Sequence, residues 1–377
     1  MPSSPADEFL WLRSGNETFA GMLEAIEAAK TSIELETYIF VADTLGEMFR
    51  ASFLRARQRG VDVRVLIDAF GSVTLLDSYW NPLRNAGGEM RWFNPITLRR
   101  FQIRNHRKLL VCDRQVVFLG GFNLSLAWKG DGVNEGWRDL GLRIIGPMAA
   151  ELSDSFDEMF ERAEFKHKRF FRLRKRPVPT RTSRARGEVL LSGPGRGRSP
   201  IKLAMRQDLV HAQDVQIIAA YFLPPRRLRR ALLHVCSRGG RVQLILPGKS
   251  DVPLMQLAAR SLYQRLLDTG VEIHEYQPQI LHAKLVVIDR VVYVGSSNLD
   301  TRSLNINYEV MVRLPDEQLS AEARAIFAQD LRHCRTLDAE TWRQSRSIWS
   351  KLKERWAYLF FARIDPYVAR RQLETMP

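Results

Sequence analysis

Hydrophobic and polar positions follow the same order in two halves of the chain. In the first half, a run rich in β-branched residues at 32–41 precedes an amphipathic stretch and a second apolar run at 61–67. In the second half, apolar runs at 214–223 and 241–247 flank a similar stretch. Such runs are typical of strands, and the stretch between them is typical of a helix. Strands that alternate with helices predict βαβ units and a largely parallel sheet.

Three further blocks match in the same order and indicate an internal duplication. The matched pairs are AGGEMRWFNP (86–95) with TGVEIHEYQP (269–278), NHRKLLVCDRQVVFLGGFNLS (105–125) with LHAKLVVIDRVVYVGSSNLD (281–300), and WRDLGLRI (137–144) with NYEVMVRL (307–314). One gap suffices to align them. We therefore expect an α/β fold of two pseudo-symmetric repeats packed into one bilobal unit.

The expected organisation has four parts. Repeat 1 spans 1–164 and repeat 2 spans 188–335. The segment 165–187 carries many lysines and arginines, two prolines and three phenylalanines, which indicates a basic linker. A solvated tether and a segment facing a membrane or nucleic acid both remain open for it, with the phenylalanines favouring the second.

The fourth part is an amphipathic tail at 336–377. At helical spacing, one face carries five apolar residues, Ile348, Leu352, Trp356, Leu359 and Phe360, with lysine and arginine around them. An in-plane membrane helix and a helix docked on the core are both compatible with this pattern.

Charge narrows the choice of partners. Lys and Arg total 57 against 42 Asp and Glu, a net charge of +15, and most of the cations are arginine. Guanidinium groups bind phosphate bidentately, so nucleic acid and anionic lipid are both candidates. No apolar run is long enough to span a bilayer, and the N-terminus has no secretory or transit pattern. Three scattered cysteines predict no disulfide framework, which suits a reducing cytosol.

The same spacing of His, Lys and Asp occurs once in each half: His106-Lys108-Asp113 and His282-Lys284-Asp289. Residues two apart share one face of a strand, so each His and its Lys should project into one site. Packing of the halves would then bring two histidines and two lysines together. Two lysines can hold a phosphate, and two histidines can supply a nucleophile and a general acid.

Other matched polar residues complete the candidate site. Asn123 and Asn298 follow the motifs at equivalent points, where donation to phosphate and a turn role are both open. Asp139 and Glu309 also match, and a carboxylate can fix a histidine tautomer. We expect Asp113 and Asp289 to hold the backbone at a strand end. A lysine beside each histidine disfavours a metal.

The doubled HxKxxxxD, each copy followed by G-[GS]-x-N, resembles the signature of the phospholipase D superfamily over residues 9–335. The segments TYIFVAD, AYFLPP and SSNLDTRSLNINYE are similar to those of bacterial cardiolipin synthases, in particular the B type, which lacks N-terminal transmembrane helices. The resemblance implies two phospholipase D-like α/β repeats around a shared active site.

The resemblance also implies a mechanism. His106 attacks the phosphodiester and forms a phosphohistidine, while His282 acts as acid and then base. Glu309 is expected to support His106, and Asp139 to support His282. No metal or organic cofactor is implied. The implied reaction transfers a phosphatidyl group to phosphatidylglycerol, with phosphatidylglycerol or phosphatidylethanolamine as donor.

Alternatives with the same chemistry stay open at this point. They are a phospholipid hydrolase, a nuclease of the superfamily, and a non-enzymatic basic binding protein, which two complete motifs disfavour. Nucleic acid is the less favoured partner. The implied location is peripheral, on the cytoplasmic side of a bacterial inner membrane. Arg99, Arg100 and Arg104, beside Phe101 and Ile103, are expected to meet the substrate or the anionic membrane surface, with pairing to the protein's own acids as the open alternative.

Overall fold

A computed structural model describes residues 6–95, 103–163, 181–182, 187–194 and 199–364. In the first half the strands are β1 (Glu8–Leu12), β2 (Ser32–Thr37), β3 (Asp62–Asp68), β4 (Glu89–Phe93), β5 (Leu109–Cys112), β6 (Val116–Gly120) and β7 (Gly141–Ile145). Its helices are α1 (Gly15–Ala28), α2 (Thr44–Gln58), α3 (Asn81–Asn85) and α4 (Pro147–Glu161), with 3₁₀ turns η1 (Asp77–Trp80) and η2 (Leu126–Trp128).

The second half repeats this plan. Its strands are β8 (Arg181–Thr182), β9 (Glu188–Ser192), β10 (Asp214–Ala219), β11 (Phe222–Leu223), β12 (Arg241–Pro247), β13 (Glu272–Tyr276), β14 (Lys284–Ile288), β15 (Val291–Gly295), β16 (Leu299–Asp300), β17 (Glu309–Pro315) and β18 (Cys334–Leu337). Its helices are α5 (Pro200–Asp208), α6 (Arg226–Ser237), α7 (Pro253–Leu267), α8 (Thr301–Asn305), α9 (Glu317–Leu331), α10 (Ala339–Gln344) and α11 (Ile348–Leu359), followed by a π-helical turn, η4 (Phe360–Ile364).

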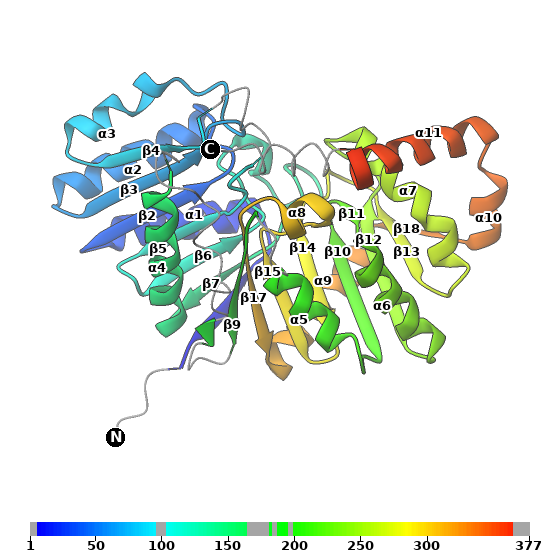
Figure 1. Cartoon of the computed structure of the whole chain (residues 1–377). Helices are drawn as coiled ribbons and strands as arrows, with labels where there is room; N and C mark the ends of the chain where they lie inside the picture. The colour runs from blue at the N-terminus through cyan, green and yellow to red at the C-terminus, as the bar shows by residue number, and fades with distance from the viewer. Residues whose placement is uncertain (1–5, 96–102, 164–180, 183–186, 195–198, 365–377) are drawn as a thin grey trace.

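Each half is built on one mixed sheet. The strand orders are β1-β7-β6-β5-β2-β3-β4 and β18-β13-β12-β10-β14-β15-β17-β9-β8, with β11 and β16 paired separately. The α/β fold of two related halves is therefore confirmed, and the two sheets lie side by side in Figure 1. The linker expected at 165–187 lies almost entirely outside the described residues.

The expectation of largely parallel sheets is wrong. Strands β2–β3–β4 and β10–β12–β13 are parallel, as their βαβ units require, but the other pairings in both sheets are antiparallel. The physical reason is the tight turns after β5 and β14. These two strands begin at or directly after the lysine of each His-x-Lys motif and are called the His-Lys strands below. Asp113, Arg114 and Asp289 have φ of +53°, +56° and +49°, values that Asp tolerates better than most residues. These turns join β5 to β6 and β14 to β15 as hairpins.

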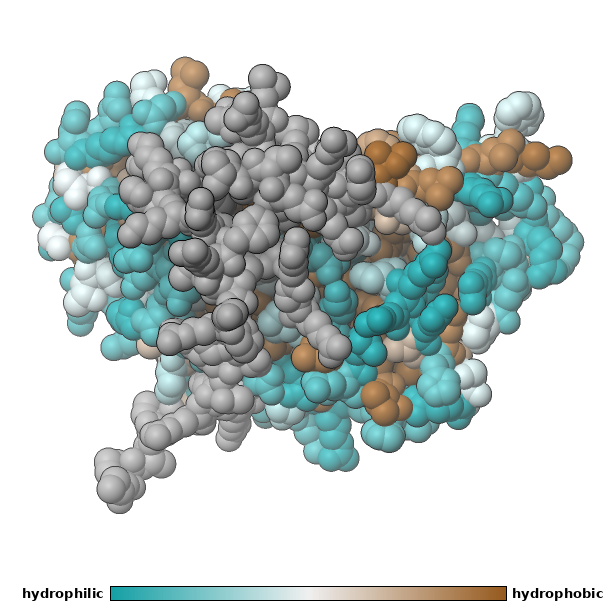
Figure 2. All heavy atoms as spheres, in the orientation of Figure 1, coloured by the Kyte–Doolittle hydropathy of each residue, from teal (hydrophilic) through white to brown (hydrophobic). Residues whose placement is uncertain are grey.

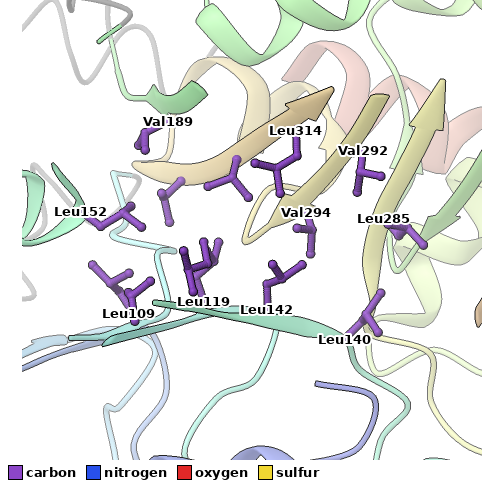
Figure 3. Packing of buried hydrophobic residues seen from close by; sticks show 14 of the residues in the cluster. Leu109, Leu119, Leu140, Leu142, Leu152, Val189, Leu285, Val292, Val294 and Leu314 are labelled. Carbon is purple, nitrogen blue, oxygen red and sulfur yellow. The ribbon is translucent and has the colours of Figure 1, made fainter. Parts of the chain in front are cut away.

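A shared hydrophobic core holds the halves together. Leucines on β5, β6 and β7 and residues of β14, β15 and β17 belong to one buried cluster, to which α4 and α9 also contribute. Figure 3 shows Leu119 and Leu142 of the first half facing Val294 of the second. Each half also has its own outer core. The two halves are thus fixed to each other through β5–β7 on one side and β14, β15 and β17 on the other.

The tail docks on the second half, since α11 packs against α7. Ala357 is buried there, and Tyr358 and Phe361 are partly buried. The apolar face that the sequence predicts does not make this contact. Ile348, Leu352, Trp356 and Leu359 are exposed. None of the helices described combines the length and apolar character that a bilayer-spanning helix needs.

A buried ion pair between the halves generates the first prediction. Arg138 precedes β7, Asp330 lies in α9, and their side chains pair bidentately at 2.8 and 2.9 Å. Asp330→Ala should lower the free energy of unfolding by about 3–5 kcal/mol, because it leaves the guanidinium buried without its counter-charge. Urea denaturation measures this.

Arg290→Gln is the control, since it breaks an exposed ion pair of the same half, with Glu317 at 3.3 Å. Arg290→Gln should lower the free energy of unfolding by less than about 1 kcal/mol. Equal losses in the two variants would contradict a special role for the pair between the halves.

Candidate active site

Backbone pairing across the halves places both histidines. His106 N donates to the carbonyl of Tyr308 at 2.9 Å, and His282 N donates to the carbonyl of Arg138 at 2.7 Å. Tyr308 directly precedes Glu309, and Arg138 directly precedes Asp139. Each histidine is therefore anchored beside the carboxylate of the other half, at the start of its own His-Lys strand.

The side chains pair crosswise in the same way. His106 Nδ1 lies 3.0 Å from Glu309 Oε2, and His282 Nδ1 lies 2.6 Å from Asp139 Oδ2. Both carboxylates are fully buried. A carboxylate on Nδ1 keeps the proton there, which leaves Nε2 of each ring as the reactive nitrogen. In His282 that nitrogen also lies 3.2 Å from Lys284 Nζ. The geometry thus forms two histidine–carboxylate pairs, each with one member from each half.

The residue that contacts each carboxylate after the hairpin also differs between the halves. At Gly121 an added Cβ would lie 2.0 Å from Asp139 Oδ1, so only glycine admits this close approach. The equivalent residue in the second half is Ser296, whose hydroxyl donates to Glu309 Oε2 at 2.5 Å. The sequence analysis missed both roles, although the Gly/Ser difference between the repeats was the signal.

Each lysine folds back beside its own histidine. Lys108 Nζ donates to the carbonyl of His106 at 2.7 Å, and Lys284 Nζ donates to the carbonyl of His282. Lys284 Nζ also lies 2.8 Å from His282 Nδ1. We assign the Nδ1 proton to the shorter contact with Asp139. Two buried ammonium groups therefore stand next to the two imidazoles, in a suitable position for a phosphate.

Burial lowers the pKa values of both histidines and both lysines. Burial, together with the nearby Lys108 and Lys284, lowers the pKa of His106 to about 4, although Glu309 opposes the shift. Burial also lowers the pKa of Lys108 to about 7. The pKa values of His282 and Lys284 are lowered for the same reason. His106 is therefore neutral near pH 7, as a nucleophile must be.

The pKa of Asp139 shifts in the opposite direction to that of an ordinary buried carboxyl. Burial acts to raise its pKa, but Lys284 and His282 outweigh burial and hold the pKa below its usual value. Asp139 thus stays ionised beside His282 and can stabilise the imidazolium form of that ring.

Aromatic rings that the sequence analysis did not identify border both histidines. The Tyr38 ring lies 5.1 Å from the His106 ring and 5.2 Å from Lys108 Nζ. The rings of Trp128 and Trp137 lie 5.3 and 5.6 Å from that of His282. Trp128 Nε1 also donates to Asp139 Oδ2 at 3.0 Å. Trp137 opens the matched block 137–144 but stands opposite Asn307, and Trp128 lies before that block, so the repeat did not single out either ring.

Both candidate asparagines are buried. Asn123 Oδ1 accepts from the backbone N–H of Ile39 at 3.1 Å, a loop-fixing contact. Asn298 Oδ1 has no hydrogen-bond partner within the described part of the chain. A buried polar atom without a partner is costly, so a polar group of a bound substrate suits this position.

Asp113 and Asp289 lie at the far ends of the His-Lys strands. Asp113 accepts backbone N–H bonds from Lys30, Thr31 and Ser32 at 2.7–3.1 Å. Asp289 accepts those of Gln213 and Asp214 at 3.0 and 2.9 Å. These contacts tie the hairpin turn to the neighbouring strand, and we assign both residues a structural role.

The arginines expected at the membrane need a correction. Arg99 and Arg100 lie outside the described residues. Arg104 is buried, and its guanidinium lies 3.4 Å from Asp68. The expectation that Arg104 meets the membrane surface is therefore wrong, because the protein uses this cation to compensate an internal carboxylate. Across the described ranges, no three His, Cys, Asp or Glu side chains are grouped to hold a metal.

The chain is similar to known proteins in both sequence and fold. The family described as "Cardiolipin synthase, PLD-like domain" matches residues 22–162 and 205–331. "Cardiolipin synthase B" of Shigella flexneri is 32% identical over 361 residues, which cover 93% of this chain and 86% of that protein. "Major cardiolipin synthase ClsA" of Bacillus subtilis is 31% identical, over 91% of this chain and 72% of that protein. In fold, the chain is similar to phosphatidylserine synthase of Haemophilus influenzae, with a TM-score of 0.74, 17% identity and coverage of 96% and 94%.

The second prediction concerns the titration of His106. Histidine NMR should show its pKa near 4 in the wild type. Lys108→Met should raise this pKa, because it removes a neighbouring cation, and Glu309→Gln should lower it further, because it removes the anion that favours the charged ring. A pKa near 6.5 that neither substitution changes would contradict the electrostatic description.

Proposed function

The chain belongs to the phospholipase D superfamily, among its cardiolipin synthases, and on this premise we propose that it transfers a phosphatidyl group to the head-group hydroxyl of phosphatidylglycerol, giving cardiolipin. The observation that carries the proposal is the pair of complete histidine–carboxylate couples at one site. The relatives named above support the choice of lipid as substrate.

In the proposed first step, Nε2 of neutral His106 attacks the phosphorus of the donor lipid. A P–N bond forms and the P–O bond to the leaving alcohol breaks, while His282 gives that oxygen its proton. The donor is phosphatidylglycerol or phosphatidylethanolamine, so the alcohol is glycerol or ethanolamine. The product is a phosphatidyl group on His106.

In the second step, His282 takes the proton from the hydroxyl of an incoming phosphatidylglycerol. The oxygen attacks the same phosphorus, the P–N bond breaks, and His106 becomes neutral again. Protons and charge balance over the cycle. The shorter contact to an ionised carboxylate, Asp139, supports His282 as the residue that carries the proton.

Lys108 and Lys284 are proposed to neutralise the non-bridging phosphate oxygens and to stabilise the charge of the transition state. Burial is the main cause of their lowered pKa values, and repulsion from Lys284 adds to the shift of Lys108. An anionic phosphodiester would relieve this repulsion and would favour protonation of His282 as well. Binding of the donor would thus prepare the general acid.

Burial supports transfer over hydrolysis. His106 and His282 are 9% and 4% exposed, so the described part of the site offers little access to water. A water-poor site protects a reactive intermediate until an alcohol arrives. We further propose a peripheral location on the cytoplasmic face of a bacterial cell membrane, where the net charge of +15 would attract anionic lipid.

The third prediction tests the activity directly. Purified protein incubated with phosphatidylglycerol in detergent micelles should yield cardiolipin and glycerol, detected by mass spectrometry. Phosphatidic acid as the dominant product would indicate a hydrolase. Cleavage of plasmid DNA without lipid turnover would overturn the lipid assignment.

His106→Ala and His282→Ala serve as matched controls in this assay. Each should abolish cardiolipin formation, because nucleophile and acid are both needed. The double variant should be no worse than either single variant, since residues that act as one unit are not additive. Activity that survives either substitution would count against the two-histidine mechanism.

A further inference from the structure

A groove lined by arginines lies on the second half, away from the histidines. It consists of two adjoining pockets of about 170 and 370 Å³ between α6, α7 and α11. Its cationic side chains are Arg226, Arg229, Arg230, Arg265, Lys351 and Arg355. We refer to this set as the arginine groove.

Cations outnumber acids in the lining of the arginine groove. Other surface arginines of this half pair with acids, such as Arg241 with Glu272 at 2.6 Å. In contrast, Arg226, Arg230 and Arg265 have no carboxylate partner in the part of the chain that the structure describes. The one acid in the lining, Glu354, is already paired with Arg346. Cations gathered without acids repel one another, so the groove favours an anionic ligand.

Exposed apolar side chains lie next to the groove. Ile348 and Trp349 of α11 are 76% and 75% exposed, and Leu352, Trp356 and Leu359 are also exposed. Figure 2 shows hydrophobic atoms at the upper right, where Figure 1 draws α11. Burying this face would be favourable, and α7 does not bury it because α11 docks through its opposite side.

Guanidinium groups beside tryptophan and aliphatic side chains match the two layers of a bilayer surface. The cations suit lipid phosphates, the indoles suit the interface, and the aliphatic residues suit the acyl boundary. Nucleic acid would use the cations and could stack on the indoles, but it offers no acyl layer for Ile348, Leu352 and Leu359. The combination therefore favours lipid.

We propose that the arginine groove and the exposed face of α11 form the surface by which this protein docks on an anionic phospholipid bilayer. The proposal deepens the proposed function and rests on it, since the substrate would be drawn from that bilayer. In Figure 1, α11 runs along the same edge of the second half as β11 and α8. β11 and α8 adjoin Asn298, because β16 starts at the next residue, pairs with β11 and leads directly into α8. Docking would thus turn the active-site end of this half toward the lipid.

The test is partitioning of the full chain onto vesicles, measured by co-sedimentation. Wild-type protein should bind vesicles that contain phosphatidylglycerol better than pure phosphatidylcholine vesicles, and high salt should weaken binding. Combined Arg226→Gln, Arg230→Gln and Arg265→Gln should weaken partitioning about a hundredfold, from about 1 kcal/mol per basic residue near the surface and 1.4 kcal/mol per tenfold. Trp349→Ser with Leu352→Ser should also weaken it, on both kinds of vesicle.

The matched control removes three other exposed arginines, with Arg114→Gln, Arg241→Gln and Arg290→Gln. Arg114 and Arg290 lie in the hairpin turns, and Arg241 lies at the start of β12. All three are at the strand ends opposite the histidines. The control has the same net charge as the groove variant and should bind vesicles nearly as well as wild type. Equal weakening by the two triple variants, or none by either, would overturn the proposal.

Two further measurements separate the possible failures. In detergent micelles the groove variant should keep wild-type cardiolipin synthesis, which shows that it is folded and that only docking is lost. A groove variant that binds DNA more weakly than the wild type but binds vesicles equally well would overturn the lipid assignment of the groove. Wild-type protein that binds vesicles but makes no cardiolipin in micelles would count against the proposed function and not against the docking surface.

Discussion

The site depends on one constraint, the backbone pairing between the two halves. The residue before each catalytic-site carboxylate is hydrogen-bonded to a histidine of the other half. This pairing fixes which carboxylate faces which ring, and neither half has a complete couple on its own. The hydrophobic cluster between the sheets and the buried ion pair of Arg138 with Asp330 hold that arrangement in place.

Burying two histidines, two lysines and two carboxylates at one site has a free-energy cost, and the shifted pKa values show which groups bear it. Burial lowers the pKa of His106 and of Lys108, which leaves the imidazole neutral near pH 7, as the proposed nucleophilic role requires. Asp139 remains ionised because cations surround it. This distribution of charge suits the anionic phosphodiester of the proposed reaction.

The sequence predicted the chemistry better than the geometry around it. Duplication of the His-x-Lys pattern pointed to the histidines and lysines that the structure places beside the buried carboxylates, because two matches in register are hard to obtain by chance. The mixed sheets were not predicted, since the hairpins depend on positive-φ turns at Asp113 and Asp289 that an apolar pattern does not reveal. Arg104 was assigned to the surface because a local pattern cannot show that Asp68, distant in sequence, needs its charge. The sequence pattern also predicted the apolar face of α11. It did not predict that the opposite side of this helix packs against α7.

The central claim is that one histidine of each half takes part in a single phosphatidyl transfer, with the covalent intermediate on the first. The most direct measurement mixes the protein with phosphatidylglycerol, quenches it rapidly under alkaline conditions that preserve phosphohistidine, and locates the modified peptide by mass spectrometry. The account predicts a phosphatidyl group on the peptide that contains His106, which disappears as cardiolipin forms. A modification on the peptide that contains His282, or turnover without any covalent intermediate, would contradict it.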